Sequence, residues 1–158
     1  MRKTFSELIA KQIQADNRVM FLTADLGFKM WNSIEENTPS NFVKMGSSEQ
    51  LMLGSAIGIS LSKKIPVCYS ISTFIINRPF EWIRNYINYE NLPVKLVGSG
   101  RDYDYAHDGW THWPTDDSKT LSLFENFKIY KPDTKEELES IFEEFIYSPN
   151  PAYLNLKR

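Results

Sequence analysis

The sequence is poor in the residues that build covalent or metal cross-links. Among 158 residues it has one cysteine, Cys68, and two histidines. A single cysteine cannot form an internal disulfide framework, and so few Cys and His residues cannot build a zinc cage. We therefore expect the fold to depend on its apolar core, with Cys68 as an inert member in the middle of a strand.

Strong charge of one sign and long apolar runs are also missing. The net charge is -2 and there is no basic run, which argues against nucleic acid or an anionic membrane as the main partner. No segment approaches the length of a membrane span, and residues 1–7 enter a helical pattern without the apolar stretch of a signal peptide. These features predict a cytoplasmic protein that binds neither nucleic acid nor membrane.

The remaining composition is that of a soluble globular protein, with 42% apolar and 24% charged residues. The length suits one full core, and we expect a single domain over residues 1–158. Aromatic residues reach 14%, with four tryptophans, and such side chains serve core packing or an oligomer interface. We expect an interface role for some of them.

Apolar periodicity alternates between the helical and the strand pattern. Thr4 with Glu7, and Thr134 with Glu136 or Glu137, resemble capping sequences. The predicted helices span residues 4–15, 30–37, 48–62, 77–89 and 134–147, and the predicted strands span 18–25, 41–45, 67–72, 94–98, 127–130 and 152–156. Residues 99–120 show neither period and are predicted to form a long loop, which in a compact domain is more often functional than idle.

The alternation predicts an α/β fold, a three-layer domain with a mostly parallel sheet flanked by helices. In such sheets ligands bind beyond the carboxyl ends of the strands. Asp25, the turn over residues 46–49, the Thr73-Phe74 pair and the 99–120 loop all follow predicted strand ends. Their convergence predicts a site at that edge of the sheet.

One of these turns passes from a strand through Gly46 into a helix that carries Glu49 in its first turn. Ser47 and Gln50 have capping-box spacing, and an acidic residue suits the positive end of a helix dipole. Helix-start chemistry is therefore a sufficient explanation of these residues when they are taken alone.

Other catalytic motifs are scarce. There is no phosphate-cradling loop of the Walker type and no dinucleotide glycine fingerprint. No nucleophile-elbow sequence supports a Ser/His/Asp triad. His112, in the predicted loop, is either a general acid or base or a histidine that satisfies a local hydrogen bond.

Several segments occur together in the order and spacing of one family. They are residues 46–50 (GSSEQ), 72–74 (STF), 78–85 (RPFEWIRN), 91–97 (NLPVKLV), 108–112 (DGWTH) and 131–133 (KPD). Through essentially its whole length the chain resembles the pyrimidine-binding domain of the transketolase group, which includes deoxyxylulose-phosphate synthase and the beta subunits of 2-oxo-acid dehydrogenases. The resemblance implies the thiamine diphosphate-binding fold.

The resemblance also implies the cofactor, thiamine diphosphate, and a role for each matching residue. Glu49 would hydrogen-bond the N1′ atom of the aminopyrimidine ring and activate the cofactor, because a carboxyl group shielded from water can share a proton with that ring. Phe74 would lie beside the ring, with Asp25 near the cofactor and Arg78 among the cofactor-binding residues. His112 would face the substrate and assist proton transfer or hold an oxyanion.

The chain departs from the family where the diphosphate is held. A Gly-Asp-Gly segment followed at a distance by Asn, which holds magnesium and the diphosphate, is missing, as is the extra C-terminal domain of transketolases. We therefore expect no metal ligand in this chain and a separate pyrophosphate-binding subunit that holds Mg2+, as in an α2β2 heterotetramer.

A second departure lies in the predicted substrate loop. Trp110 replaces the usual proline of the segment that starts at Asp108, Trp113 replaces a glutamine or histidine, and Gly100 stands where many relatives have a histidine. The stretch that begins at Arg101 is unusually polar. We expect these residues to shape a pocket for a donor or acceptor other than the ordinary pentose and hexose phosphates.

The leading hypothesis is thus one subunit of a two-component, thiamine diphosphate-dependent transketolase-like enzyme that moves a ketol or acyl unit, with sugars as substrates. Two alternatives stay open at this point. One is the beta-type subunit of a 2-oxo-acid decarboxylase, dehydrogenase or synthase, and the other is a catalytically silent scaffolding subunit.

Overall fold

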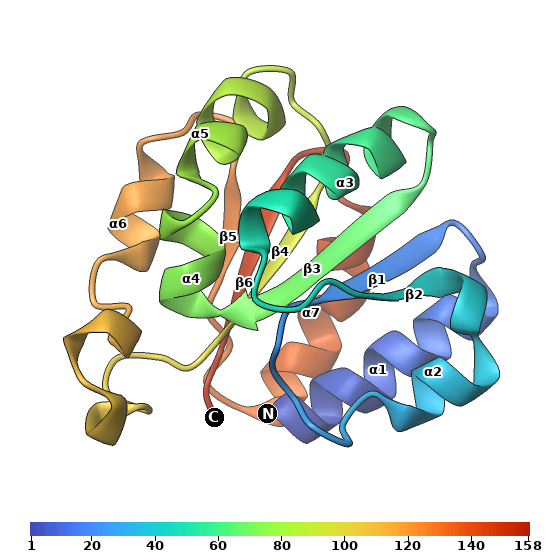
Figure 1. The fold of residues 1–158 in the computed structure, drawn as a ribbon, viewed down its shortest axis with the longest axis horizontal. Coiled ribbons are helices and arrows are strands. Elements are labelled where there is room, and N and C mark those ends of the chain that lie inside the picture. The colour runs from blue at the N-terminus through green and yellow to red at the C-terminus, as the bar shows by residue number, and fades with distance from the viewer.

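The computed structural model describes residues 1–158, which fold around a six-stranded sheet in which every neighbouring pair of strands is parallel (Figure 1). The order across the sheet is β2-β1-β3-β4-β6-β5. The strands are β1 (Val19–Thr23), β2 (Phe42–Lys44), β3 (Ile65–Ile71), β4 (Lys95–Ser99), β5 (Lys128–Tyr130) and β6 (Ala152–Leu156).

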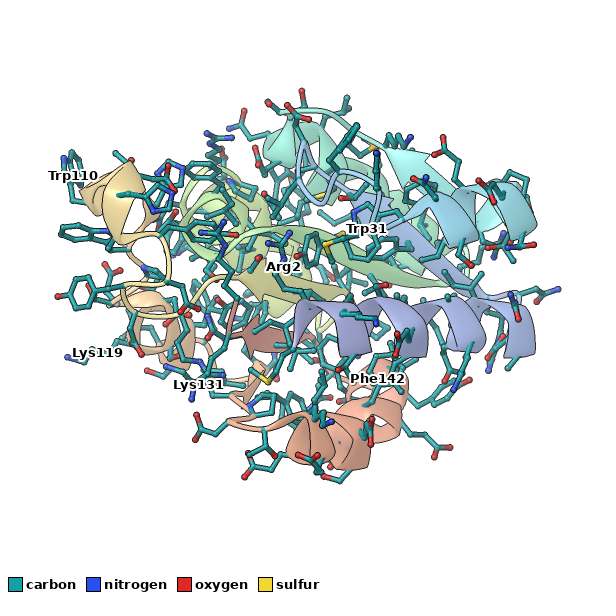
Figure 2. The ribbon with its side chains drawn as sticks, turned by 90° about the horizontal axis from the view of Figure 1, so that it is seen from below. Arg2, Trp31, Trp110, Lys119, Lys131 and Phe142 are labelled. Atoms are coloured by element: carbon teal, nitrogen blue, oxygen red, sulfur yellow. The ribbon has the colours of Figure 1, made fainter.

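Helices cover both faces of this sheet, so the predicted α/β class is confirmed. The α-helices are α1 (Arg2–Ala15), α2 (Asn32–Asn37), α3 (Glu49–Leu61), α4 (Ser72–Asn77), α5 (Phe80–Trp82), α6 (Asp117–Ser122) and α7 (Lys135–Tyr147). Short 3-10 turns form η1 (Pro39–Asn41), η3 (Ala106–Asp108) and η4 (Trp110–His112), and η2 (Ile83–Asn88) is a π-helical segment. Figure 2 shows α1 running along one face of the sheet, with Phe142 of α7 beneath it.

The four inner strands, β1, β3, β4 and β6, are buried on both faces, which explains their largely apolar sequences, whereas the edge strands β2 and β5 are partly exposed. Because successive side chains alternate, Val67 and Tyr69 pack against α1 and α7, whereas Cys68 between them packs against α3 and α4. Burial raises the pKa of Cys68, so the residue is a thiol within the core.

The chain reverses its direction of travel across the sheet between β1 and β3. From β1 it passes through α2 to β2 at the edge, and it then returns through α3 to β3 on the other side of β1. Such a switch point opens a crevice at the carboxyl ends of the two diverging strands. Figure 1 shows α3 beginning near the carboxyl end of β3, and the first residue of α3 is Glu49.

The helix predicted over residues 77–89 is wrong in its start and its continuity. α4 begins directly after β3, and the path is interrupted at Pro79, which has no N–H for the preceding turn. The remainder forms the short α5 and the π-helical η2. The break leaves Arg78 at the end of α4, where its side chain can turn toward the sheet edge.

Two of the three predicted caps are also wrong. α1 begins at Arg2, two residues before Thr4, and Ser48 rather than Ser47 precedes α3, in both cases without a side-chain cap. The third is confirmed, because the Thr134 hydroxyl accepts a hydrogen bond from the Glu137 N–H at 3.1 Å.

Among the helices, none combines the length and the apolar character that a membrane crossing requires.

Lys95, at the start of β4, is a fully buried amine. Its Nζ atom donates to the carbonyl oxygens of Ser148 and Asn150, each at 2.7 Å. A neutral amine has two N–H bonds and satisfies both acceptors, whereas an ammonium group would bury a charge with no acidic partner. Burial lowers the pKa of Lys95 from 10.5 to about 7.

This amine makes the stability of the fold depend on pH. Between pH 7 and pH 10.5 the unfolded chain keeps a proton that folded Lys95 has released, so the free energy of unfolding rises with pH across this window. In Lys95→Met this contribution is absent. Both melting temperatures are measured by circular dichroism. The difference between them, wild type minus Lys95→Met, should increase as the pH rises from 7 to 10.5.

The matched control is Lys3→Met, which removes an amine that is exposed to solvent. Its melting temperature should follow that of the wild type across the same pH range. Parallel curves for the wild type and Lys95→Met would contradict the lowered pKa.

Candidate active site

Glu49 is a buried carboxylate with both oxygens engaged. It is 2% exposed, and as the first residue of α3 it lies at the positive end of the helix dipole. Its Oε1 accepts a hydrogen bond from the Ser70 hydroxyl at 2.7 Å, and its Oε2 pairs with Nη1 of Arg78 at 2.7 Å. Ser70, near the end of β3, was not identified from the sequence, since a serine within a strand forms no recognisable motif.

A line of contacts extends from Glu49 into the predicted loop. The guanidinium group of Arg78 lies over the ring of Phe74, 3.8 Å from its centroid. The other neighbour of Phe74 is His112, whose ring meets it edge-on at 4.8 Å between centroids. The structure therefore brings together four residues that the sequence marked as candidates: Glu49, Arg78, Phe74 and His112.

The loop is attached to α4 beside these residues. The Thr73 hydroxyl donates to the carbonyl oxygen of Thr111 at 2.7 Å, and the Thr111 hydroxyl lies 3.0 Å from Nδ1 of His112. The Nε2 atom of His112 has no hydrogen-bond partner within the chain. Nδ1 thus makes a local hydrogen bond, as expected of a structural histidine, whereas Nε2 is available for general acid or base catalysis. Both interpretations of His112 therefore have support.

A cleft of about 420 Å³ opens between α4 and the loop. Its lining includes Phe74, Arg78, Trp110, Trp113 and Asp116. Aromatic rings, a cation and a carboxylate therefore share this lining, which suits a flat or polyhydroxylated ligand.

Asp25 lies in a different hollow, of about 410 Å³, beyond the ends of β1 and β2. Lys29 and the Glu35–Lys44 ion pair share this second hollow. Asp25 therefore borders the switch point from the β1 side and does not take part in the contacts between Glu49 and His112.

The remaining loop residues differ in what their side chains do. Trp110 is 79% exposed and stands at the outer end of the loop, pointing away from the sheet (Figure 2). Trp113 is held by its indole N–H, which donates to the Tyr105 carbonyl oxygen at 3.2 Å. Asp108 is exposed and lies 3.2 Å from His107, outside the cleft lining.

Gly100 is a position that other residues could not occupy without rearrangement. Its φ of +89° is in the left-handed region, and a Cβ atom there would collide with the ring of Tyr105. Tyr105 is buried, and its hydroxyl lies 3.1 Å from the Ser99 hydroxyl. An aromatic ring thus fills the space into which a larger side chain at position 100 would project.

Arg101 points into the protein, away from the cleft, contrary to its predicted place among the substrate-facing residues. Its Nε atom donates to Oδ1 of Asn155 at 2.6 Å, and Nη1 pairs with Asp133 at 2.8 Å. Its Nη2 atom donates to the carbonyl oxygens of Pro132 and Asn155. Its side chain therefore anchors the start of the loop to β6.

The end of the loop is anchored by a second buried group, which the sequence did not reveal. Asp117 begins α6 inside the predicted loop, and its Oδ2 accepts bonds from the Tyr153 hydroxyl at 2.7 Å and from Asn155 at 2.8 Å. Burial, with the Asp117 carboxylate beside it, raises the pKa of Tyr153 well above its ordinary value, so the hydroxyl remains a donor. Ser72 and Gly100 complete the network.

The parallel sheet, its switch point and the carboxylate, cation and aromatic group gathered there define an α/β domain with a candidate ligand site at the carboxyl edge of its strands. The family described as transketolase, pyrimidine binding domain, matches residues 1–158. The chain belongs to this family. No group of three or more His, Cys, Asp and Glu side chains is arranged to hold a metal ion.

Among curated relatives, the 6-deoxy-6-sulfo-D-fructose transketolase subunit SqwH of Clostridium sp. (strain MSTE9) is 26% identical over 100% of this chain and 49% of its own length. An apulose-4-phosphate transketolase subunit of Actinobacillus succinogenes is 30% identical over 75% of this chain and 38% of its own length. The chain thus spans at most about half of these relatives.

Solved structures agree on the fold. A split gene transketolase, described as an inactive beta4 tetramer, superposes with a TM-score of 0.87 and 26% identity over 99% of this chain and 50% of that one. A transketolase from Leishmania mexicana has the same fold, with a TM-score of 0.87 at 20% identity over 99% of this chain and 25% of its own.

The anchoring role of Arg101 predicts a large loss of stability on its removal. Arg101→Ala leaves the Asn155 amide oxygen and two buried carbonyl groups without donors, and we expect the free energy of unfolding to fall by about 2–4 kcal/mol. Urea unfolding followed by tryptophan fluorescence measures this change.

Arg18→Ala is the matched control, since Arg18 pairs with Asp16 at the surface. Its removal should change the unfolding midpoint far less. Equal shifts in the two variants would show that the buried bonds of Arg101 do not anchor the loop.

Proposed function

We propose that the chain is the pyrimidine-binding subunit of a two-component, thiamine diphosphate-dependent transketolase-like enzyme that transfers a ketol or acyl unit. The observation that carries the proposal is the buried Glu49 carboxylate at the switch point, beside the face of Phe74. Membership of the transketolase pyrimidine-binding family supports it.

The residues at this corner suit the pyrimidine end of thiamine diphosphate. A flat, hydrogen-bonding guanidinium group already spans the space between Glu49 and the Phe74 ring, so the corner accepts a planar polar group. When bound, the cofactor supplies its thiazolium ring, which stabilises a carbanion. Glu49 would hold a proton at N1′ of the ring, Phe74 would stack on the ring, and Asp25 would border the cofactor from the β1 side.

His112 is the residue that we assign to the substrate. Its Nδ1 atom is engaged by Thr111, so Nε2 is the atom that can move a proton or stabilise a developing oxyanion. Trp110, Trp113 and Asp108 belong to the same loop and would shape the entrance for the substrate.

The substrate class is a sugar or sugar derivative. Curated relatives named for a 6-deoxy-6-sulfo-D-fructose and an apulose-4-phosphate transketolase support a sugar with unusual substituents. In this chain Tyr105 fills the space beside Gly100, where many transketolases carry a histidine. The pocket would therefore bind its substrate with contacts different from those of ordinary transketolases.

A second polypeptide would complete the site by holding Mg2+ and the diphosphate, as in an α2β2 heterotetramer. The relatives' description as subunits supports this arrangement, as does the split gene transketolase that forms a beta4 tetramer. The outward side of α3 is suited to such a contact, because Leu51 and Leu61 are exposed and a Cβ atom at Gly58 would project into open space.

Glu49→Gln tests the central assignment. In a complex reconstituted with a pyrophosphate-binding subunit, we expect turnover to fall by about 100-fold or more, because the amide cannot hold the proton at N1′. Assembly, followed by size-exclusion chromatography, should be unchanged.

Glu136→Gln is the matched control, since Glu136 also lies in the first turn of a helix but is exposed. It should retain full activity. Wild-type turnover in the Glu49→Gln complex would rule out the proposed role.

Product analysis with ketose phosphates and with 2-oxo acids then identifies the class of donor.

Cofactor binding provides a separate check. Thiamine diphosphate with Mg2+, titrated by calorimetry, should bind tightly only when both polypeptides are present, because this chain engages the pyrimidine end alone. Tight binding to the isolated chain would contradict the two-component arrangement, and no binding in any combination would favour a scaffolding role.

A further inference from the structure

Access to the Glu49 carboxylate is controlled by the two groups that bond to it. The Ser70 hydroxyl on Oε1 is 1% exposed and lies beneath the carboxylate, within the end of β3. The Arg78 side chain on Oε2 is 44% exposed and borders the cleft. A ligand that hydrogen-bonds to Glu49 from the cleft must therefore displace Arg78, because Ser70 is enclosed by the sheet.

Arg78 makes two contacts that together define one position. Its planar guanidinium group lies 3.8 Å from the centroid of Phe74 and donates to Glu49 at 2.7 Å. A flat heterocycle that stacked on this face of Phe74 and bonded to Oε2 of Glu49 would occupy the same position. The guanidinium and the heterocycle cannot make both contacts at the same time.

We infer that Arg78 is a placeholder that occupies the pyrimidine position and sets the affinity of this chain for the cofactor. The inference rests on the proposed function, because it takes the aminopyrimidine as the ligand of Glu49 and Phe74. It changes the expectation for Arg78, which the family resemblance groups with the cofactor-binding residues. Before binding, its cation balances the buried carboxylate, and binding exchanges this ion pair for the bond to the ring.

The surroundings of Arg78 allow this exchange. The residue follows the last turn of α4 directly before the break at Pro79, and its side chain is 44% exposed. Asp116 lines the same cleft and offers the displaced guanidinium another carboxylate.

The test uses the full chain and a probe that lacks the diphosphate, 4-amino-5-hydroxymethyl-2-methylpyrimidine. Its dissociation constant is measured by NMR titration for the wild type, Arg78→Ala, Arg78→Lys and the control Arg84→Ala. Arg84 is an exposed arginine six residues further along, and it bonds only to Asn85. Melting temperatures measured on the same samples establish that each variant is folded.

We expect Arg78→Ala to bind the probe roughly fivefold more tightly than the wild type, since the probe no longer displaces an ion pair. Arg78→Lys keeps a charge for Glu49 but has no flat group over Phe74, so its affinity should lie between the two. Arg84→Ala should match the wild type. This order of affinities would not arise from a general loss of stability, which weakens binding.

Weaker or unchanged binding in Arg78→Ala overturns the placeholder role. If Glu49→Gln also abolishes binding, the proposed function stands. Arg78 is then a cofactor-binding residue where Arg78→Ala weakens binding, and it has no part in binding where Arg78→Ala leaves the affinity unchanged. If no variant binds the probe and Glu49→Gln retains turnover in the reconstituted complex, both the placeholder role and the proposed function fail.

Discussion

The buried carboxylate of Glu49 is the constraint around which the rest of the site is built. A charge at 2% exposure is tolerable only with close partners, and the fold provides the α3 dipole, the Ser70 hydroxyl and the Arg78 cation. Each partner comes from a different element, and all three converge because the chain reverses at the switch point between β1 and β3. The site thus follows directly from the order of the strands.

The alternation of helices and strands could be predicted from the sequence because β1, β3 and β6 are buried along most of their length and are mostly apolar. The incorrectly predicted helices lie where tertiary contacts override the local sequence pattern. α6 forms inside the predicted 99–120 loop because Asp117 is bound by Tyr153 and Asn155, and α4 starts at Ser72 because that hydroxyl bonds to Gly100. No local pattern carries such long-range partners.

Some residues of the candidate site could likewise be predicted from the sequence, and others could not. Glu49, Phe74 and His112 were identified through family motifs, and the structure places them along one line of contacts with Arg78. Motifs identify the residues but not the direction of their side chains. The sequence therefore predicts Arg101 on the substrate side, whereas its guanidinium group is bonded to Asn155. Ser70, which fixes one oxygen of the central carboxylate, belongs to no motif.

The central claim is that Glu49 holds the proton that activates thiamine diphosphate. The most direct measurement is the rate at which the carbon-bound proton of the thiazolium ring exchanges for deuterium in the complex with a pyrophosphate-binding subunit, read by NMR after acid quenching. We expect exchange in the wild-type complex to be far faster than in free cofactor, and exchange in the Glu49→Gln complex to return toward the free rate. Equally fast exchange in both complexes would contradict it.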